Sequence, residues 1–410
     1  AYVSASYLIT AVGCLSAGQL PDIPGRDAFQ GEWYHTGRWP RKETINFSGK
    51  KVGIIGTGSS GIQAIPVLAQ QAEHLTVFQR TPNFSVPARN RELLPDEVSH
   101  IKREIKQIRE FCRWSTIGQN YDFRDGEALS LSSQELDRQL EEDWQRGGFQ
   151  WMFGSYADLV FDETANKIAA DFVRKKIRGA IKDPAIGEKL VPVDHPIGTK
   201  RLPLDNGYFE TFNRSNVSLV DLRETPIEKI VAKGIQTSDY LYDLDALVFA
   251  TGFDALTGPL NQIAIRGEKG VLLKEKWRDG PKTYLGVAVP GFPNMFMITG
   301  PGSPSVLGNM PTSIEQHVDW ICDCIGHMKN NGFREVDAET RAEQDWSQHV
   351  KEKSGMSLVN KVDSWMTGIN SNVPSKSTRI VGGRYGGSVQ SYRGLCDKVA
   401  AENYQAMRFS

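Results

Sequence analysis

A glycine-rich loop at residues 56–61, with the sequence G-T-G-S-S-G, constrains the fold of this chain more than any other feature. It follows a short apolar run at residues 51–55 and precedes a helical stretch from about residue 60 to 72, and a second apolar run occupies residues 75–79. This order of strand, loop, helix and strand is the first unit of a doubly wound fold that binds dinucleotides. Pro66 predicts a kink in the helix. A glycine turn without a ligand is the alternative.

The glycines of the loop match what a pyrophosphate requires. Gly56 allows a tight turn, Gly58 lets the backbone approach the phosphates, and Gly61 permits close packing of helix and strand. The helix N-terminus attracts negative charge. We predict a cofactor phosphate site made of Gly56, Thr57, Gly58, Ser59, Ser60, Gly61 and Gln63.

The residue after the second apolar run selects the cofactor. An NAD site places Asp or Glu about twenty residues after the glycines, where it binds the ribose hydroxyls. This chain has Arg80 there, followed by Thr81. A guanidinium binds a 2′-phosphate through charge-assisted hydrogen bonds, which an acid would prevent. We therefore expect NADP(H) rather than NAD(H). The alternative is that Arg80 is a solvated surface residue.

Length and charge limit the other classes of function. A chain of 410 residues is long enough for two domains, and 40% hydrophobic with 24% charged residues is typical of a soluble globular protein. A formal net charge of −1 argues against nucleic acid or an anionic membrane as a partner. No apolar run is long enough to span a membrane, and no signal peptide is evident.

The five cysteines are scattered and odd in number, which is typical of a reducing cytosol, so we expect a cytoplasmic protein. Cys322 and Cys324 lie in a helical pattern, where residues two apart point to opposite sides. We expect no metal site.

The remaining patterns alternate between helix and strand. Residues 92–190 are charged and helical, residues 216–249 have β character with a hairpin near 233–234, and residues 293–298 form another strand. A helix over residues 313–328, capped by Ser313 and ended by Gly332, is followed by helices near 338–353 and 392–404. Residues 7–13 form a strand with no preceding turn, and we expect a further segment before them.

A second motif lies just before the glycine loop. Residues 29–40 read F-x-G-x-x-x-H-x-x-x-W-P, which resembles the fingerprint of type I Baeyer–Villiger monooxygenases. Related N- and S-oxygenating flavin monooxygenases usually carry Tyr or Phe where Trp39 stands. Residues 79–84, 198–201, 250–254, 300–305 and 364–370 resemble further segments of the same family.

The resemblance implies an α/β fold of two Rossmann-like dinucleotide-binding domains, for FAD and NADP. Residues 1–16 would be a remnant of the FAD domain and residues 251–410 its C-terminal part. Residues 17–250 would form the NADP domain, with the fingerprint as a linker at 29–40 and a helical insertion at about 92–190. The first glycine motif of the family, which binds FAD, does not occur before Gly56.

The resemblance also implies an activity. NADPH would reduce FAD, reduced flavin and dioxygen would give a flavin peroxide, and the peroxide would convert a ketone to an ester or lactone. We expect a ketone and dioxygen as partners and a monomer or weak oligomer. An N- or S-oxygenating monooxygenase and a non-catalytic NADP-binding fragment are the alternatives.

Residue roles follow from the same resemblance. Arg201 is the expected catalytic residue, because an oxyanion needs a fixed cation and arginine stays protonated. Lys200 would bind the NADP phosphate, since neighbours on an extended strand point opposite ways. The other expected cofactor contacts are Thr251, Gly252, Asn309, Met310 and Trp365, and the expected substrate pocket is Ser303, Pro304 and Ser305.

Within the fingerprint we expect structural roles. His35 would hold hydrogen bonds between the domains, with proton transfer as the less favoured reading, and Trp33 and Trp39 would be packing residues. The fingerprint positions are Phe29, Gly31, His35, Trp39 and Pro40.

Overall fold

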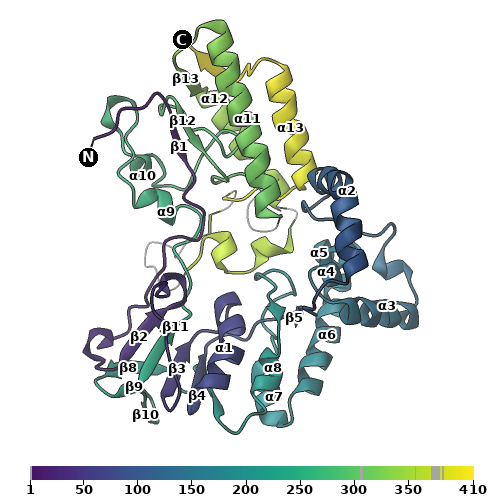
Figure 1. The fold of residues 1–410 in the computed structure, drawn as a ribbon, viewed down its shortest axis with the longest axis vertical. Helices are drawn as coiled ribbons and strands as arrows, with labels where there is room; N and C mark the ends of the chain where they lie inside the picture. Colours follow the sequence, from purple (N-terminus) through teal and green to yellow (C-terminus); the bar gives the residue numbers. More distant parts are fainter. Residues whose placement is uncertain (1, 305–307, 356, 371–378, 381–382) are drawn as a thin grey trace.

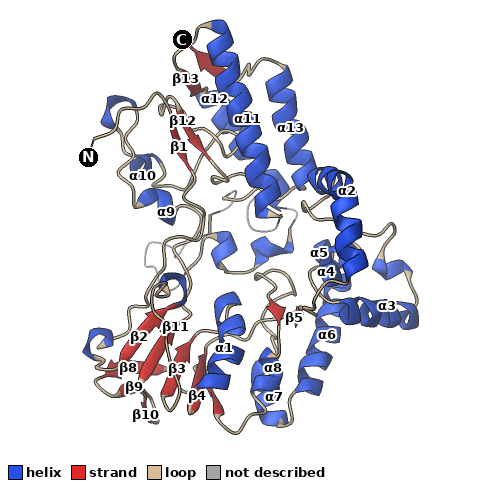
Figure 2. Cartoon of the chain, in the orientation of Figure 1, coloured by secondary structure: helices blue, strands red, loops and turns tan. Residues whose placement is uncertain are grey.

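The computed structural model describes residues 2–304, 308–355, 357–370, 379–380 and 383–410 (Figure 1). A region built on a sheet lies at one end of the molecule, long helices lie at the other, and further helices run along one side (Figure 2). Residues 14–19 and 252–256 run side by side between the two ends, joined by backbone hydrogen bonds such as Asp254 N–H to Ala17 O at 2.8 Å.

A parallel sheet of five strands carries the glycine loop, which confirms the predicted α/β class. Its order is β2-β11-β3-β4-β7, and every neighbouring pair is parallel. The strands are β2 (Glu32–His35), β3 (Lys51–Ile55), β4 (His74–Gln79), β7 (Val217–Asp221) and β11 (Ala246–Phe249). The three central strands, β11, β3 and β4, are almost continuously buried, which is typical of a parallel sheet covered on both faces.

Each face of this sheet has its own cover. Helices α1 (Ser59–Gln71) and α8 (Tyr208–Thr211) belong to the main apolar core with β3 and β4. The opposite face packs against an antiparallel sheet of β8 (Ile227–Val231), β9 (Gly234–Thr237) and β10 (Leu241–Asp243). The predicted hairpin is confirmed, because Val231 pairs with Gly234. Helix α1 is continuous in the structure, with Pro66 buried inside it.

The expected helical insertion is also present. Its helices are α2 (Pro95–Trp114), α3 (Ser133–Arg146), α4 (Gln150–Phe153), α5 (Asp158–Phe161), α6 (Glu163–Ala180) and α7 (Pro184–Leu190). Two short parallel strands, β5 (Val86–Pro87) and β6 (Leu204–Asp205), pair at its base. Because both ends of the insertion return to this pair, the helices are fixed beside the sheet.

The second region joins the two ends of the chain. Strand β1 (Leu8–Thr10) pairs in parallel with β12 (Met295–Met297), and β13 (Val336–Ala338) pairs with β14 (Met407–Phe409). Its helices are α9 (Gly258–Asn261), α10 (Leu273–Lys276), α11 (Met310–Asn331), α12 (Thr340–Gly355) and α13 (Val389–Ala401).

One helix boundary differs from the sequence expectation. Helix α11 begins at Met310, so Asn309 rather than Ser313 occupies the cap position, and Pro311 lies in the first turn. The predicted end is confirmed, since Gly332 follows the last turn with φ 76°. No helix among the described residues is long and apolar enough to cross a membrane.

Candidate cofactor and active site

The glycine loop has the close contacts that its sequence predicts. Gly56 has φ 108°, and a Cβ atom there would lie 2.6 Å from the carbonyl oxygen of Ala250. A Cβ atom on Gly61 would lie 2.2 Å from the oxygen of Gly56, so α1 packs directly against the loop. A Cβ atom on Gly58 would meet nothing within 4 Å. The loop therefore leaves open space at the N-terminus of α1, where a pyrophosphate fits.

The other predicted loop residues divide into buried and accessible ones. Thr57 is buried, and its Oγ1 donates to the carbonyl oxygen of Thr81 at 3.0 Å, which ties the loop to the end of β4. Ser59 and Ser60 are half-buried in the first turn of α1, and Gln63 is exposed one turn further along.

Arg80 and Lys200 lie within electrostatic reach of each other. Arg80 is exposed just after β4. Burial lowers the pKa of Lys200, and the positive charge of Arg80 lowers it further, while Asp194 and Asp363 act in the opposite direction. Two cations at the end of β4 suit a doubly charged phosphate.

Lys200 and Arg201 lie in a loop, so the expected extended strand is wrong. They nevertheless face different surroundings. The neighbours that shift the pKa of Lys200 include Arg80, whereas Cys14, whose own thiol pKa is raised by burial, acts on the pKa of Arg201. Burial is the main cause of the lowered pKa of Arg201.

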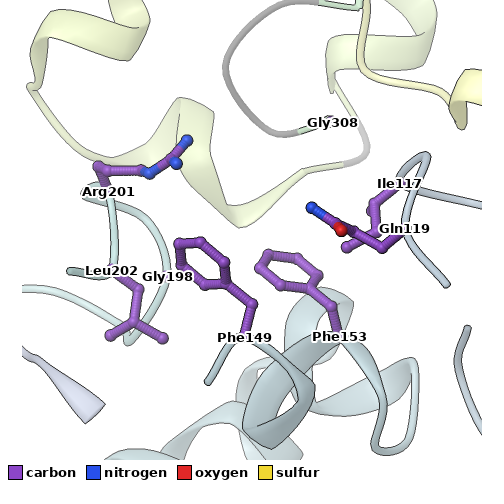
Figure 3. Close-up of a pocket in the computed structure, with 8 residues that line it drawn as sticks. All are labelled: Ile117, Gln119, Phe149, Phe153, Gly198, Arg201, Leu202 and Gly308. Carbon is purple, nitrogen blue, oxygen red and sulfur yellow. The ribbon is translucent and has the colours of Figure 1, made fainter. Parts of the chain in front are cut away.

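Arg201 lies at a small cavity walled by aromatic rings (Figure 3). The cavity has a volume of about 40 Å³. The guanidinium carbon of Arg201 lies 5.2 Å from the centroid of the Phe149 ring, and Phe153 lies beside that ring. Sequence patterns did not single out Phe149 or Phe153, because they belong to no motif and lie about fifty residues before Arg201.

A larger cavity adjoins the first. Its volume is about 410 Å³, and the two cavities share Ile117, Phe153, Gly198 and Gly308. Pro304, one of the three residues expected in the substrate pocket, lines the larger cavity. Ser303 is buried instead, and its Oγ donates to the oxygen of Gly300 at 2.7 Å. Ser305 lies outside the described residues.

The crossing between the two regions contains Thr251 and Gly252. Thr251 Oγ1 donates to the oxygen of Gln19 at 2.8 Å, and the oxygen of Gly252 accepts from the backbone N–H of Gln19 at 3.0 Å. His35 is 2% exposed; its Nδ1 accepts from the N–H of Gly37 at 3.0 Å, and its Nε2 lies 3.2 Å from the oxygen of Gly252. Since Nδ1 accepts, Nε2 carries the proton and donates to Gly252. Burial is the main cause that lowers the pKa of His35, so the neutral ring fits.

The other fingerprint side chains pack around the sheet. Phe29 contacts the apolar cluster under β11, and a Cβ atom on Gly31 would lie 2.4 Å from the oxygen of Asp245. Trp39 is 37% exposed and contacts the ring of Tyr34, and Pro40 after it is half-buried. Trp33 is 51% exposed, with its ring edge-to-face on Phe249.

The predicted flavin contacts lie in the second region. Asn309 and Met310 form the start of α11, where the Asn309 side chain makes no cap hydrogen bond. The N–H groups of that first turn suit an electron-rich group of a flavin. Trp365 begins the short 3₁₀ helix η6 (Trp365–Thr367) and packs against the cluster of Cys14, Val359 and Met366.

Comparison with known proteins decides the family. The chain is 38% identical over 407 residues to a Baeyer–Villiger monooxygenase of Pseudooceanicola batsensis, covering 99% of this chain and 73% of the relative. It is 40% identical to cyclohexanone 1,2-monooxygenase of an Acinetobacter species, covering 95% and 70%. The chain belongs to the family of Baeyer–Villiger monooxygenases. The resemblance carried by the fingerprint is thereby confirmed.

Two further comparisons bear on chemistry within the Baeyer–Villiger family. The crystal structure of OTEMO in complex with FAD and NADP superposes with a TM-score of 0.94 at 37% identity, covering 100% of this chain and 76% of that one. This likeness agrees with two Rossmann-like domains. A phenazine N-monooxygenase of Lysobacter antibioticus is 42% identical over 98% of this chain and 73% of the relative. A search of protein-family models found no match.

Within the described residues, no group of three or more His, Cys, Asp or Glu side chains is placed to hold a metal ion. Cys322 is exposed and Cys324 is buried, as expected for opposite sides of α11.

Proposed function

We propose that this Baeyer–Villiger monooxygenase uses NADPH and dioxygen to convert ketones to esters or lactones, with FAD as its second cofactor. The observation that carries the proposal is the half-buried guanidinium of Arg201 at an aromatic cavity that adjoins a larger apolar one. Bound FAD and NADP(H) would supply hydride transfer and the activation of dioxygen. The residues of the chain bind and orient the reactants.

The nicotinamide cofactor would be held at both ends. The open space at Gly58 and the first turn of α1 suit the pyrophosphate. Arg80 and Lys200 suit the 2′-phosphate, because two nearby cations favour a doubly charged anion. Trp365, which packs against the cluster of Cys14, Val359 and Met366, is proposed to contact the nicotinamide end.

Arg201 is proposed as the catalytic residue. The carbonyl oxygen of the ketone gains negative charge when the carbonyl carbon is attacked, and a fixed cation stabilises that charge. Phe149 restricts the guanidinium by contact with its ring, so little reorganisation is needed when the charge develops. The aromatic walls also keep water away from the reacting carbon.

The domain arrangement is proposed as follows. Residues 17–250 form the NADP domain, with the linker at 29–40 and the helical insertion at about 92–190, and residues 1–16 and 251–410 belong to the FAD domain. The pairing of β1 with β12 supports this division. The His35 hydrogen bonds to Gly37 and Gly252 support the linker as an interdomain element. We also propose a cytoplasmic location and a monomeric or weakly associating chain.

N-oxygenation is the second candidate, favoured by the likeness to a phenazine N-monooxygenase. A product assay separates the two. FAD-loaded protein would be given NADPH, dioxygen and a panel of cyclic and aryl ketones, and in parallel a panel of aromatic N-heterocycles. Esters or lactones from the first panel support the proposal, whereas N-oxides alone, with every ketone unchanged, refute it.

A further inference from the structure

Arg384 is a buried cation in the second region. Its side chain belongs to a residue that is 5% exposed, and its Nε has no hydrogen-bond partner. No carboxylate of the described residues forms an ion pair with it. Burial lowers the pKa of Arg384 to about 10, so the guanidinium is still charged at neutral pH. A buried unpaired charge is strongly unfavourable unless it binds a ligand, so this side chain needs a function.

The side chain faces the larger cavity. Arg384 lines the cavity of about 410 Å³ that shares four residues with the cavity at Arg201. The two cations therefore belong to adjoining spaces between the helical insertion and the second region. A ligand that reaches from one cavity into the other would meet both.

The chemistry of the larger cavity is apolar and positive. Its walls include Phe123, Phe161, Leu358 and Val389, and the charged residues among the described ones that line it are Arg384 and Lys353. None of the described residues that line it is Asp or Glu. Such a cavity suits a ligand with an apolar body and a negatively charged end, because apolar walls strengthen the attraction between opposite charges.

The backbone around Arg384 is held firmly in place. The oxygen of Gly383 accepts from the N–H of Gly302 at 3.1 Å, and the N–H of Tyr385 donates to the oxygen of Ser303 at 3.1 Å. The oxygen of Arg384 itself accepts from Ser354 Oγ at 2.6 Å. Three anchors fix the main chain from which the buried side chain of Arg384 extends into the cavity wall.

We propose that Arg384 is a binding site for a carboxylate of the substrate, which makes the preferred substrate a keto acid with an apolar skeleton. This inference rests on the proposed function. The ketone carbonyl lies at Arg201, the carboxylate forms a bidentate pair with Arg384, and the hydrocarbon between them fills the aromatic cavity. Lys353, which is exposed, adds long-range attraction at the rim of the cavity.

The test compares an acid with its uncharged ester. The FAD-loaded full chain is assayed with 3-(2-oxocyclohexyl)propanoate and with its methyl ester, which share one skeleton and one ketone. We expect kcat/KM for the acid to exceed that for the ester by about ten-fold or more, since hydrogen bonds to charged groups are strong. Equal values, or a preference for the ester, would overturn the proposal.

Substitutions of Arg384 test whether this residue causes the preference for the acid over the ester. Arg384→Met should lower kcat/KM for the acid by about ten- to a hundred-fold, mainly through KM, and change that for the ester by less than about three-fold. Arg384→Lys should restore part of the preference. Arg341→Met, on the exposed face of α12, is the matched control and should change kcat/KM neither for the acid nor for the ester. An equal loss for acid and ester in Arg384→Met would contradict a carboxylate site.

Binding without turnover separates this inference from the proposed function. Calorimetric titration with 3-cyclohexylpropanoate, which has a carboxylate but no ketone, should show binding to the wild type and about ten-fold weaker binding to Arg384→Met. If neither ketone is oxidised but this difference is found, the carboxylate site stands and the proposed reaction fails. If the wild type does not bind the acid, the carboxylate site fails.

Discussion

The guanidinium carbon of Arg201 lies 5.2 Å from the centroid of the Phe149 ring. The two residues belong to different parts of the chain, because Phe149 directly precedes α4 in the helical insertion and Arg201 follows α7. A cation over an aromatic face is attracted by the ring, and the contact limits the rotamers of the arginine. The helical insertion thus takes part in setting the position of the cation that the proposed reaction requires.

Replacing Arg201 tests its catalytic role. Arg201→Ala should lower kcat for ester formation by at least about a hundred-fold, because removing one preorganised oxyanion partner has an effect of that size. The dissociation constant of NADPH should stay within about two-fold, since Arg80 and Lys200 are the residues proposed to bind the phosphate. Rates come from product analysis and NADPH binding from fluorescence titration. A variant that forms ester within ten-fold of the wild-type rate would remove Arg201 from the reaction.

Replacing Phe149 tests whether the aromatic contact orients the arginine. Phe149→Leu keeps an apolar wall but loses the ring face, so we expect kcat to fall by about three- to thirty-fold, the range of a cation–π contact. Phe172→Leu is a control in the same helical region, since Phe172 stacks on Trp151. Similar losses of kcat in both variants, measured at equal flavin content, would argue against a specific role for Phe149.

Arg80 and Lys200 should determine the choice of nicotinamide cofactor. Arg80→Ala and Lys200→Met should each raise KM for NADPH by about ten-fold or more and change KM for NADH by less than about three-fold. Arg103→Ala, on an exposed face of α2, is the matched control. The assay is steady-state consumption of each nucleotide. An unchanged ratio of the two KM values in either variant would exclude that residue from the phosphate site.

His35 should act through stability and not through proton transfer. His35→Leu removes the acceptor of the Gly37 N–H and one of the two donors to the oxygen of Gly252, which still accepts from the N–H of Gln19. Each lost hydrogen bond costs about 0.5–1.5 kcal/mol. We expect a lower melting temperature. The pH profile of kcat/KM in the remaining activity should keep its shape, and the loss of one limb of that profile would show that His35 transfers a proton.

Acid should destabilise the protein through His317. Its Nδ1 accepts from the N–H of Thr299 at 2.8 Å, its Nε2 lies 2.7 Å from Tyr392 Oη, and Tyr392 donates to the oxygen of Leu285. Burial lowers the pKa of His317 from 6.5 to about 3. Between these values the unfolded chain binds a proton that the folded chain does not. Stability is therefore full above pH 6.5 and falls as the pH drops toward 3.

For one such histidine, the free energy of unfolding should fall by at most about 1.4 kcal/mol for each pH unit of acidification. The burial-lowered pKa values of His35 and His195 act in the same direction. Chemical denaturation at pH values between about 6.5 and 5.5 measures this slope. The raised carboxyl pKa values of Asp337 and Glu343 act in the opposite direction, so Asp337→Asn and Glu343→Gln variants separate the two effects. A free energy of unfolding that rises on acidification over this interval would contradict the account.

Local sequence patterns predicted the elements whose type and bounds depend on residues close by in the chain. The glycine loop, α1 and β4 follow from residue type and spacing within thirty residues, and so does the end of α11 at Gly332. The start of α11 did not follow, because tertiary contacts set it. The N–H of Asn309 donates to the oxygen of Ile117 and Thr312 Oγ1 to the oxygen of Gly118, so packing on the helical insertion extends the helix past Ser313.

The surroundings of the candidate site could be predicted only in part for the same reason. Arg201 belongs to a motif, but Phe149 and the buried Arg384 belong to none. The fold brings Phe149 against Arg201 and places Arg384 at the adjoining cavity. Lys200 and Arg201 were expected on a strand. The turn at Gly198, with φ 83°, breaks the extended backbone just before them.

The central claim is that this chain inserts oxygen beside a ketone carbonyl. The most direct measurement gives the FAD-loaded protein NADPH, isotopically labelled dioxygen, and an equimolar mixture of a cyclic ketone and an aromatic N-heterocycle. The account predicts a lactone with one labelled oxygen atom as the main product, and its loss in Arg201→Ala. A labelled N-oxide with the ketone recovered unchanged would contradict it.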